Sequence, residues 1–215
     1  MQVKLCGFTE IKSLQAAVDA KCDFVGFVFY PKSPRYITVA EATRISQIIP
    51  QNIAKVAVVV NADLALLQEI SDQLKPQYFQ FHGDEDLAYL QQVRKNFSQK
   101  IIKAITLETD EDLQKIAIFK DHCDMILLDA KPIVKDEFGG SGRKWNWEIL
   151  SDFNCNKGWI LAGGLNATNI ADAIKKTKAS IVDISSGIEE ARGVKSEKLI
   201  AEFMAIIHSL SHDTQ

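Results

Sequence analysis

Two short apolar runs that end in small residues and glycines decide the fold: Trp159-Ile160-Leu161-Ala162-Gly163-Gly164 and Ile181-Val182-Asp183-Ile184-Ser185-Ser186-Gly187. Short runs that are mostly apolar and often β-branched are typical of strands buried on both faces of a parallel sheet. Glycine directly after such a strand indicates a turn in which the backbone can approach a ligand closely. The two runs therefore predict neighbouring strands with a functional edge at their carboxyl ends.

Six further runs of the same kind precede these two, and helical patterns lie between them. The eight predicted strands are Val3–Gly7, Phe24–Phe29, Ala54–Val60, Tyr78–His82, Ile101–Ile105, Met125–Asp129, Trp159–Ala162 and Ile181–Ser185. Apolar residues recur at three- and four-residue steps from Leu64 to Leu74 and from Leu199 to Leu210, as on the buried face of a helix. Thr38 and Ser196 stand just before helical stretches and are predicted N-caps.

This regular alternation of strand and helix indicates the fold class. Eight units in 215 residues leave about 27 residues each, which suits a compact barrel. We predict an α/β fold, a single (β/α)₈ TIM barrel, as one domain over residues 1–215. A doubly wound open sheet is the alternative, but it usually has about five or six strands, and no Gly-x-Gly-x-x-Gly motif follows the first strand here.

Composition and charge exclude several classes of protein. Hydrophobic residues make up 47% and charged residues 25% of the chain, as in an ordinary globular domain. No apolar run approaches the roughly 18–20 residues that span a bilayer, and no secretory signal is evident, so we expect a cytoplasmic protein without membrane contact. The net charge of −3 predicts no nucleic-acid partner. The four cysteines form no Cys-x-x-Cys pair and no metal-ligand spacing with histidine, so we expect neither disulfides nor a metal.

Reactive and backbone-permissive residues gather at the carboxyl ends of the predicted strands, which form the active-site rim of a barrel. They are Cys6-Gly7, Tyr30-Pro31-Lys32-Ser33-Pro34-Arg35-Tyr36, His82-Gly83, Asp129, Gly163-Gly164 and Asp183-Ile184-Ser185-Ser186-Gly187. A long loop from Lys131 to Trp145, which contains Gly139-Gly140-Ser141-Gly142, follows the sixth strand. We therefore expect the site of chemistry at this rim.

Anion binding is the first function that the rim residues indicate. Main-chain N–H groups and seryl hydroxyls beside a helix N-terminus favour a phosphate, and the candidates are Gly163, Gly164, Ser185, Ser186 and Gly187. Ordinary turn chemistry explains either stretch alone, but two stretches on neighbouring strands favour a phosphate site. Arg35 offers a planar cationic fork for a carboxylate or phosphate, although a lone arginine more commonly forms a surface salt bridge.

Proton transfer is the second function that they indicate. Cys6 is a candidate base or nucleophile, and Asp129 is a candidate proton donor. A small buried cysteine is usually inert packing, however, and an aspartate that ends a strand is often a helix cap. His82 either activates Cys6, as in a Cys–His hydrolase, or donates a hydrogen bond within the rim. These residues alone leave the alternatives open.

The motifs together resemble one enzyme family from end to end. They are Lys4-Leu5-Cys6-Gly7-Phe8-Thr9, Gly26 to Tyr36, Gln80-Phe81-His82-Gly83, Leu128-Asp129, Gly139-Gly140-Ser141-Gly142, Leu161-Ala162-Gly163-Gly164-Leu165 and Asp183 to Glu189. In order and spacing the chain resembles the phosphoribosylanthranilate isomerase family of tryptophan biosynthesis. Cys-Gly-x-Thr, Ser-Pro-Arg and Ser-Ser-Gly-x-Glu are jointly specific, whereas a Gly-Gly pair alone is weak.

The resemblance implies an Amadori rearrangement of N-(5-phosphoribosyl)anthranilate without metal or other cofactor. It implies that Cys6 is the general base and Asp129 the general acid, and that Arg35 holds the anthranilate carboxylate. His82 and Asp183 are expected to contact the substrate, and the glycine and serine residues after strands seven and eight to bind its phosphate. A modestly lowered pKa would suit Cys6 to its role.

Other enzyme functions would require other residues at the strand ends. A metal-dependent sugar-phosphate epimerase requires several His and Asp ligands at strand ends, and His82 is the only histidine at the predicted rim. An indole-glycerol-phosphate-type cyclase requires lysines at strand ends, but Lys4 and Lys103 lie inside strands. A catalytically silent barrel that serves as a subunit is an alternative of another class. We expect a monomer or homodimer that acts on a small phosphorylated molecule.

Overall fold

The computed structural model describes residues 1–107, 112–130, 147–150, 153 and 158–212. Eight parallel strands form a closed barrel in which each pairs with the next and β8 pairs with β1. The strands are β1 (Gln2–Cys6), β2 (Phe24–Val28), β3 (Ala54–Val59), β4 (Tyr78–Phe81), β5 (Lys100–Leu107), β6 (Met125–Ala130), β7 (Trp159–Ala162) and β8 (Ile181–Ile184). The predicted TIM barrel is thus confirmed, and each predicted strand is present to within two residues at its ends.

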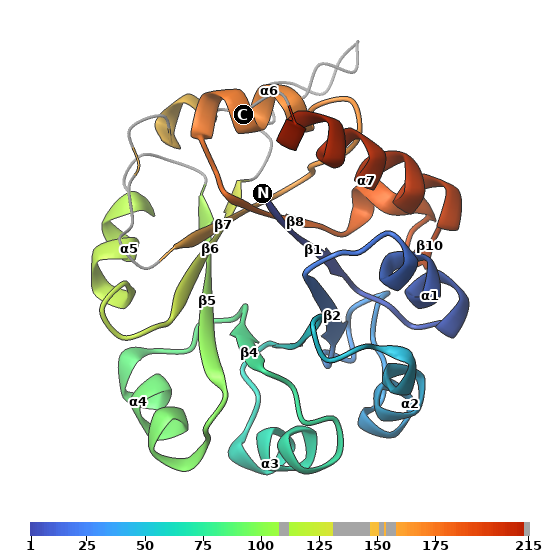
Figure 1. Ribbon diagram of the computed structural model, residues 1–215. Helices are drawn as coiled ribbons and strands as arrows, with labels where there is room; N and C mark the ends of the chain where they lie inside the picture. The colour runs from blue at the N-terminus through green and yellow to red at the C-terminus, as the bar shows by residue number, and fades with distance from the viewer. Residues whose placement is uncertain (108–111, 131–146, 151–152, 154–157, 213–215) are drawn as a thin grey trace.

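Helices surround this barrel on its outer side (Figure 1). They are α1 (Ile11–Asp19), α2 (Val39–Ile45), α3 (Leu64–Gln73), α4 (Leu87–Asn96), α5 (Asp112–Phe119), α6 (Ile170–Thr177) and α7 (Glu197–His212), with short 3-10 helices η1 (Ser46–Ile48), η2 (Trp147–Leu150) and η3 (Ser186–Ile188). A two-stranded hairpin of β9 (Glu189–Ala191) and β10 (Val194–Lys195) stands between η3 and α7. The sequence analysis did not predict this hairpin. No helix of the described ranges is long and apolar enough to span a membrane.

Helix starts follow the expected capping chemistry. The Thr38 hydroxyl accepts the backbone N–H of Glu41, and the Glu41 carboxylate accepts the backbone N–H of Thr38, so the two residues form a capping box. Ser196 accepts the backbone N–H of Leu199 at 3.5 Å. Both predicted caps are confirmed, and Asp63 and Asp86 cap α3 and α4 in the same way. Each cap stabilises its helix by about 1 kcal/mol.

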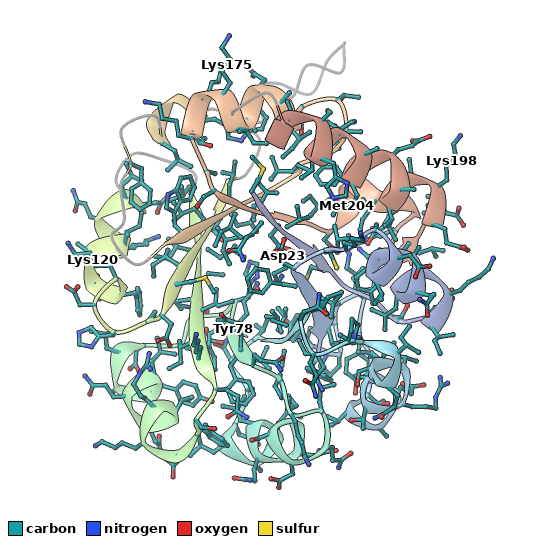
Figure 2. The ribbon with its side chains drawn as sticks, in the orientation of Figure 1. Asp23, Tyr78, Lys120, Lys175, Lys198 and Met204 are labelled. Carbon is teal, nitrogen blue, oxygen red and sulfur yellow. The ribbon has the colours of Figure 1, made fainter. Side chains whose placement is uncertain are left out.

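Side chains alternate along each strand between the barrel interior and the layer of helices. The interior cluster consists of Cys6, Phe24, Val28, Val56, Val58, Ile102, Ala104, Met125, Leu127, Ile160, Ala162 and Ile181. A larger cluster, which includes Leu5, Phe27, Leu128 and Phe203, packs the strands against the helices. Figure 2 shows Tyr78 near the barrel axis, whereas Lys120, Lys175 and Lys198 point outward from the helices. The alternation directs Cys6, Asp129 and Asp183 into the barrel.

Two buried lysines are paired on opposite faces of the barrel wall. Lys4 lies inside and binds both carboxylate oxygens of Asp183, at 3.0 and 2.9 Å. Lys103 binds Glu85 at 2.9 Å, and Glu85 also accepts the backbone N–H groups of Asn61 and Gly83. A buried charge requires such a partner because desolvation of an isolated ion is very costly. The Glu85 contacts join the loops that follow β3 and β4, and the second of these loops begins with His82.

Candidate active site

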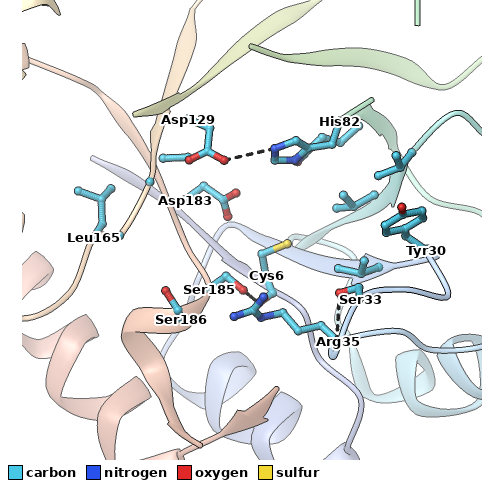
Figure 3. Close-up of a pocket in the computed structure, with 17 residues that line it drawn as sticks. Cys6, Tyr30, Ser33, Arg35, His82, Asp129, Leu165, Asp183, Ser185 and Ser186 are labelled. Atoms are coloured by element: carbon cyan, nitrogen blue, oxygen red, sulfur yellow. Dashed lines mark hydrogen bonds and ion pairs between the residues drawn. The ribbon is translucent and has the colours of Figure 1, made fainter. Parts of the chain in front are cut away.

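A cavity of about 310 Å³ opens at the carboxyl ends of the strands (Figure 3). Within the described part of the chain, its wall includes every predicted site residue except Gly187. These residues are Cys6, Arg35, His82, Asp129, Gly163, Gly164, Asp183, Ser185 and Ser186. Closure of the barrel therefore brings together residues from both ends of the chain. Tyr30, Ser33 and Gln80 also line the cavity, and the sequence analysis did not single them out as site residues.

Cys6 ends β1 with its thiol directed into the cavity (Figure 3). Gly26 of the neighbouring strand makes room for the sulfur, because a Cβ atom there would lie 2.6 Å from Sγ. Burial raises the pKa of the Cys6 thiol above its ordinary value, and the nearby Lys4 ammonium opposes this effect in part. Desolvation thus outweighs the neighbouring cation, and the shift is opposite to the modest lowering that would suit a general base.

Lys4 and Asp183 form an ion pair beside this thiol. Lys4 is two residues before Cys6 on the same strand, so both side chains enter the barrel interior. Burial alone lowers the pKa of Lys4, but the charges of Asp183 and Cys6 and their hydrogen bonds raise it above its ordinary value. The ammonium is therefore kept charged close to Cys6. The sequence analysis placed Lys4 inside a strand and missed its position beside Cys6, although the inward alternation of the two side chains was a usable signal.

His82 and Asp129 face each other across the mouth of the cavity (Figure 3). The distance from His82 Nε2 to Asp129 Oδ2 is 3.3 Å, and the Gln80 amide nitrogen lies 3.3 Å from His82 Nδ1. In the tautomer with its proton on Nε2, His82 donates a hydrogen bond to Asp129 while its Nδ1 accepts from the Gln80 amide. No hydrogen bond joins His82 to Cys6 in the described part of the chain. This pairing disfavours the Cys–His hydrolase alternative.

Arg35 reaches the cavity from the loop after β2. Its Nε donates to Glu189 Oε1 at 2.6 Å, and its Nη2 donates to Glu189 Oε2 at 2.8 Å. The aliphatic part of Arg35 crosses Gly7, where φ is +90° and a Cβ atom would lie 2.6 Å from Arg35 Cδ. The arginine is thus both paired with Glu189 and part of the cavity wall, so its salt bridge does not exclude ligand binding.

The loops after β7 and β8 form another part of the wall. Gly163 and Gly164 have positive φ values of +99° and +56°, which glycine adopts without steric cost. The backbone N–H groups of Gly164 and Ser186 donate to no other atom of the described residues. They are therefore free to bind an anion in the cavity.

Ser185 lines the cavity as expected, but its hydroxyl is bonded within the protein, and Gly187 lies outside the cavity wall. The Ser185 hydroxyl donates to the Cys6 carbonyl at 3.0 Å and accepts from Lys195 Nζ at 3.1 Å, so it joins β8 to β1. Gly187 does not line the cavity, and a Cβ atom at this position would overlap the carbonyl oxygen of Leu165. Its physical role is close packing of η3 against the loop after β7. The predicted Gly139-Gly140-Ser141-Gly142 motif and the loop around it lie outside the described residues.

Comparisons with known proteins agree on one family. The model of the family described as N-(5'phosphoribosyl)anthranilate (PRA) isomerase matches residues 3–205. An N-(5'-phosphoribosyl)anthranilate isomerase of Parvibaculum lavamentivorans is 38% identical over 207 residues, which are 95% of this chain and 96% of that protein.

Solved structures show the same likeness in three dimensions. A crystal structure of phosphoribosyl anthranilate isomerase from Thermotoga maritima has a TM-score of 0.86 and 30% identity, covering 97% of this chain and 99% of the other. A crystal structure of phosphoribosyl anthranilate isomerase in complex with reduced 1-(o-carboxyphenylamino)-1-deoxyribulose 5-phosphate has a TM-score of 0.83 and 28% identity, with the same coverage.

Proposed function

The chain belongs to the phosphoribosylanthranilate isomerase family, and we propose that Cys6 and Asp129 carry out its isomerisation of N-(5-phosphoribosyl)anthranilate. The product is 1-(2-carboxyphenylamino)-1-deoxyribulose 5-phosphate, and the reaction is an Amadori rearrangement. One observation carries the assignment of roles. A thiol from β1 and a carboxyl group from β6 line the same cavity, whose wall also contains a paired arginine, two glycines after β7 and two serines after β8.

The first step opens the ribofuranose ring. The bond between C1 and the ring oxygen breaks as that oxygen receives a proton, and the anilino nitrogen forms an iminium with C1. Asp129 supplies this proton from one carboxyl oxygen. His82 donates to the other, Oδ2, and so holds the carboxyl group in one orientation. A positioned acid of this kind accelerates such a step by roughly 10²–10⁴-fold.

The second step moves hydrogen from C2 to C1. The iminium acidifies the C2–H bond, and the Cys6 thiolate removes that proton to leave an enolamine. The enolamine then takes a proton at C1 and loses the proton of its C2 hydroxyl, which gives the ketone. The charged Lys4 beside Cys6 favours the thiolate against the cost of its burial. All atoms of the substrate remain in the product and no electrons are exchanged, so the chemistry requires no metal or redox cofactor.

Three parts of the wall fit three parts of the substrate. The free backbone N–H groups of Gly164 and Ser186 suit the phosphate, together with Gly163 and Ser185. Arg35 suits the anthranilate carboxylate, because a planar guanidinium matches two carboxylate oxygens. His82 and Asp183 line the same cavity and are assigned to contact the ribose. The relative bound to a reduced deoxyribulose 5-phosphate derivative supports a phosphorylated ligand of this length. A cytoplasmic location and a monomeric or homodimeric state remain predictions.

A steady-state assay of the purified full chain tests the function. The chain is expected to isomerise phosphoribosylanthranilate at the same rate with and without a chelator. Loss of turnover on chelation would contradict the metal-free mechanism. Absence of turnover in both conditions, with intact secondary structure, would favour the catalytically silent barrel.

A further inference from the structure

Glu189 is the ion-pair partner of Arg35 and has no role in the proton transfers described above. It follows η3 as the first residue of β9, and its side chain is only 4% exposed. Its carboxylate accepts from Arg35 Nε at 2.6 Å, Arg35 Nη2 at 2.8 Å, Lys195 Nζ at 2.7 Å and the Gly193 backbone N–H at 3.1 Å. Burial opposes ionisation, but these donors lower the pKa of Glu189 to about 2. Glu189 is therefore a fixed anion at neutral pH.

The pattern of donors decides which part of Arg35 faces the cavity. A guanidinium has five N–H donors, and Glu189 occupies the Nε donor and one Nη2 donor along its side. The remaining three donors belong to Nη1 and Nη2 at the end of the fork. That end can bind a second carboxylate with two parallel hydrogen bonds. Arg35 thus has room for one internal and one external carboxylate at once.

We propose that Glu189 is a positioning residue that fixes Arg35 so that the end of its guanidinium receives the anthranilate carboxylate of the substrate. This inference rests on the proposed function and extends it, because it assigns recognition of the carboxyl group to a pair of residues. Glu189 acts through Arg35 and contacts no reacting atom.

The β9–β10 hairpin supplies a rigid support for this pair. Lys195 is 1% exposed and joins Glu189 to Ser185, whose backbone oxygen lies 2.9 Å from Lys195 Nζ. At the hairpin turn, Gly193 has φ of +87°, and a Cβ atom there would lie 2.5 Å from the Pro34 carbonyl oxygen. The hairpin therefore packs directly against the loop that carries Arg35. Loop and hairpin hold the guanidinium from two sides.

Charge balance explains why the pair still attracts an anion. Two basic side chains, Arg35 and Lys195, share the single anion Glu189. Lys195 Nζ binds the Ser185 hydroxyl and the Glu189 carboxylate. The uncompensated positive charge is thus available at the guanidinium.

Two substrates separate this role from a merely structural one. The first is phosphoribosylanthranilate, and the second is the phosphoribosyl derivative of aniline, which lacks the carboxylate. For the variant Glu189→Gln we expect KM for the first substrate to rise roughly tenfold or more, as for loss of a charged hydrogen bond. We expect kcat to change by less than about threefold, and the kinetics of the aniline derivative to match those of the parent chain.

The ratio of kcat/KM for the two substrates is the decisive measurement. Both are measured on one preparation, so the ratio does not depend on the fraction of protein that folds. Glu189→Asp keeps a carboxylate for Lys195 on a side chain that is one methylene shorter. Because the shorter side chain holds Arg35 less well, this variant is expected to lower the ratio as well. Glu190→Gln, at the exposed neighbouring position, is the matched control and is expected to leave it unchanged. In an Arg35→Ala background, Glu189→Gln is expected to have no further effect on KM.

The outcomes distinguish failure of the positioning role of Glu189 from failure of the proposed function. An unchanged ratio in Glu189→Gln and Glu189→Asp, with an active parent chain, would overturn the positioning role. An equal loss toward both substrates would also overturn it, because that outcome reflects general damage to the site. An inactive parent chain would instead contradict the proposed function.

Discussion

His82 Nε2 lies 3.3 Å from Asp129 Oδ2, so the imidazole of the loop after β4 is paired with the carboxyl group of β6 across the mouth of the barrel. Both side chains are about one-third exposed and line the cavity. The contact leaves Oδ1 of Asp129 for proton transfer to a substrate. His82 is therefore a partner of the proposed acid and not of the thiol.

Replacement of His82 tests this relationship. His82→Gln removes the imidazole that orients Asp129 and is expected to lower kcat, but by less than Asp129→Asn, because the acid itself remains. In steady-state assays, His82→Gln added to Asp129→Asn is expected to cost little more than Asp129→Asn alone. Additive losses in the double variant would show that His82 acts independently of Asp129.

The proposed acid and base are each expected to be essential for turnover. Cys6→Ser and Asp129→Asn should each lower kcat by at least roughly a hundredfold, since each removes one positioned proton-transfer group. Circular dichroism should show an intact fold in both variants, and Cys123→Ser serves as a cysteine control away from the cavity. Turnover close to that of the parent chain in either site variant would remove the replaced residue from the mechanism.

Arg35→Ala should weaken binding of the anthranilate end of the substrate. The truncation removes the charged donors that face the cavity, so KM should rise by roughly tenfold or more. It also leaves Glu189 without one of its two cationic partners, and thermal melting must therefore accompany the kinetics. If KM and kcat both stay unchanged, Arg35 has no part in carboxylate recognition.

Reactivity of the thiols should follow their burial. Burial raises the pKa of Cys6, so in the free protein its alkylation by iodoacetamide should accelerate with pH through a midpoint above that of an ordinary thiol. Lys4→Gln removes the opposing cation and should move the midpoint higher still. Mass spectrometry of the Cys6 peptide measures the rate, and Cys22, whose pKa burial raises to about 12, is an internal reference that should remain unmodified near neutral pH. A midpoint that falls in Lys4→Gln would contradict the role of Lys4.

Acid should destabilise the barrel partly through Glu189. Its pKa is about 2 in the folded chain, below its usual value of 4.5, so the folded state binds its proton less readily than the unfolded state does. The resulting contribution to the free energy of unfolding is complete above about pH 4.5 and is lost as the pH falls toward 2. Urea unfolding between pH 7 and pH 2.5 should therefore show a weaker decline for Glu189→Gln. Parallel curves for both chains would indicate that Glu189 titrates alike in the folded and unfolded states.

The strand pattern and the residues at the strand ends were accessible from the sequence. Strands such as Trp159–Ala162 are apolar throughout because both of their faces are buried. The carboxyl ends of parallel strands lie on one rim of a barrel, and this holds for any order of the strands. For this reason the sequence alone assigns Cys6, Asp129 and the residues after β7 and β8 to one rim of the barrel. Local signals also identified the Thr38 cap, because its partners lie within one helical turn.

Only the tertiary structure decided how the site residues are paired. Lys4 and Asp183 are separated by 179 positions, and their contact depends on closure of the barrel. Arg35 and Glu189 are separated by 154 positions, and their contact depends on the orientation of the β9–β10 hairpin, which the sequence analysis did not predict. The direction of the Cys6 pKa shift likewise depends on desolvation, which is a property of the packed barrel and not of neighbouring residues in the chain. The periodicity and the strand ends therefore identified the candidate site residues, whereas long-range packing determined their hydrogen-bond and ion-pair partners and the pKa of Cys6.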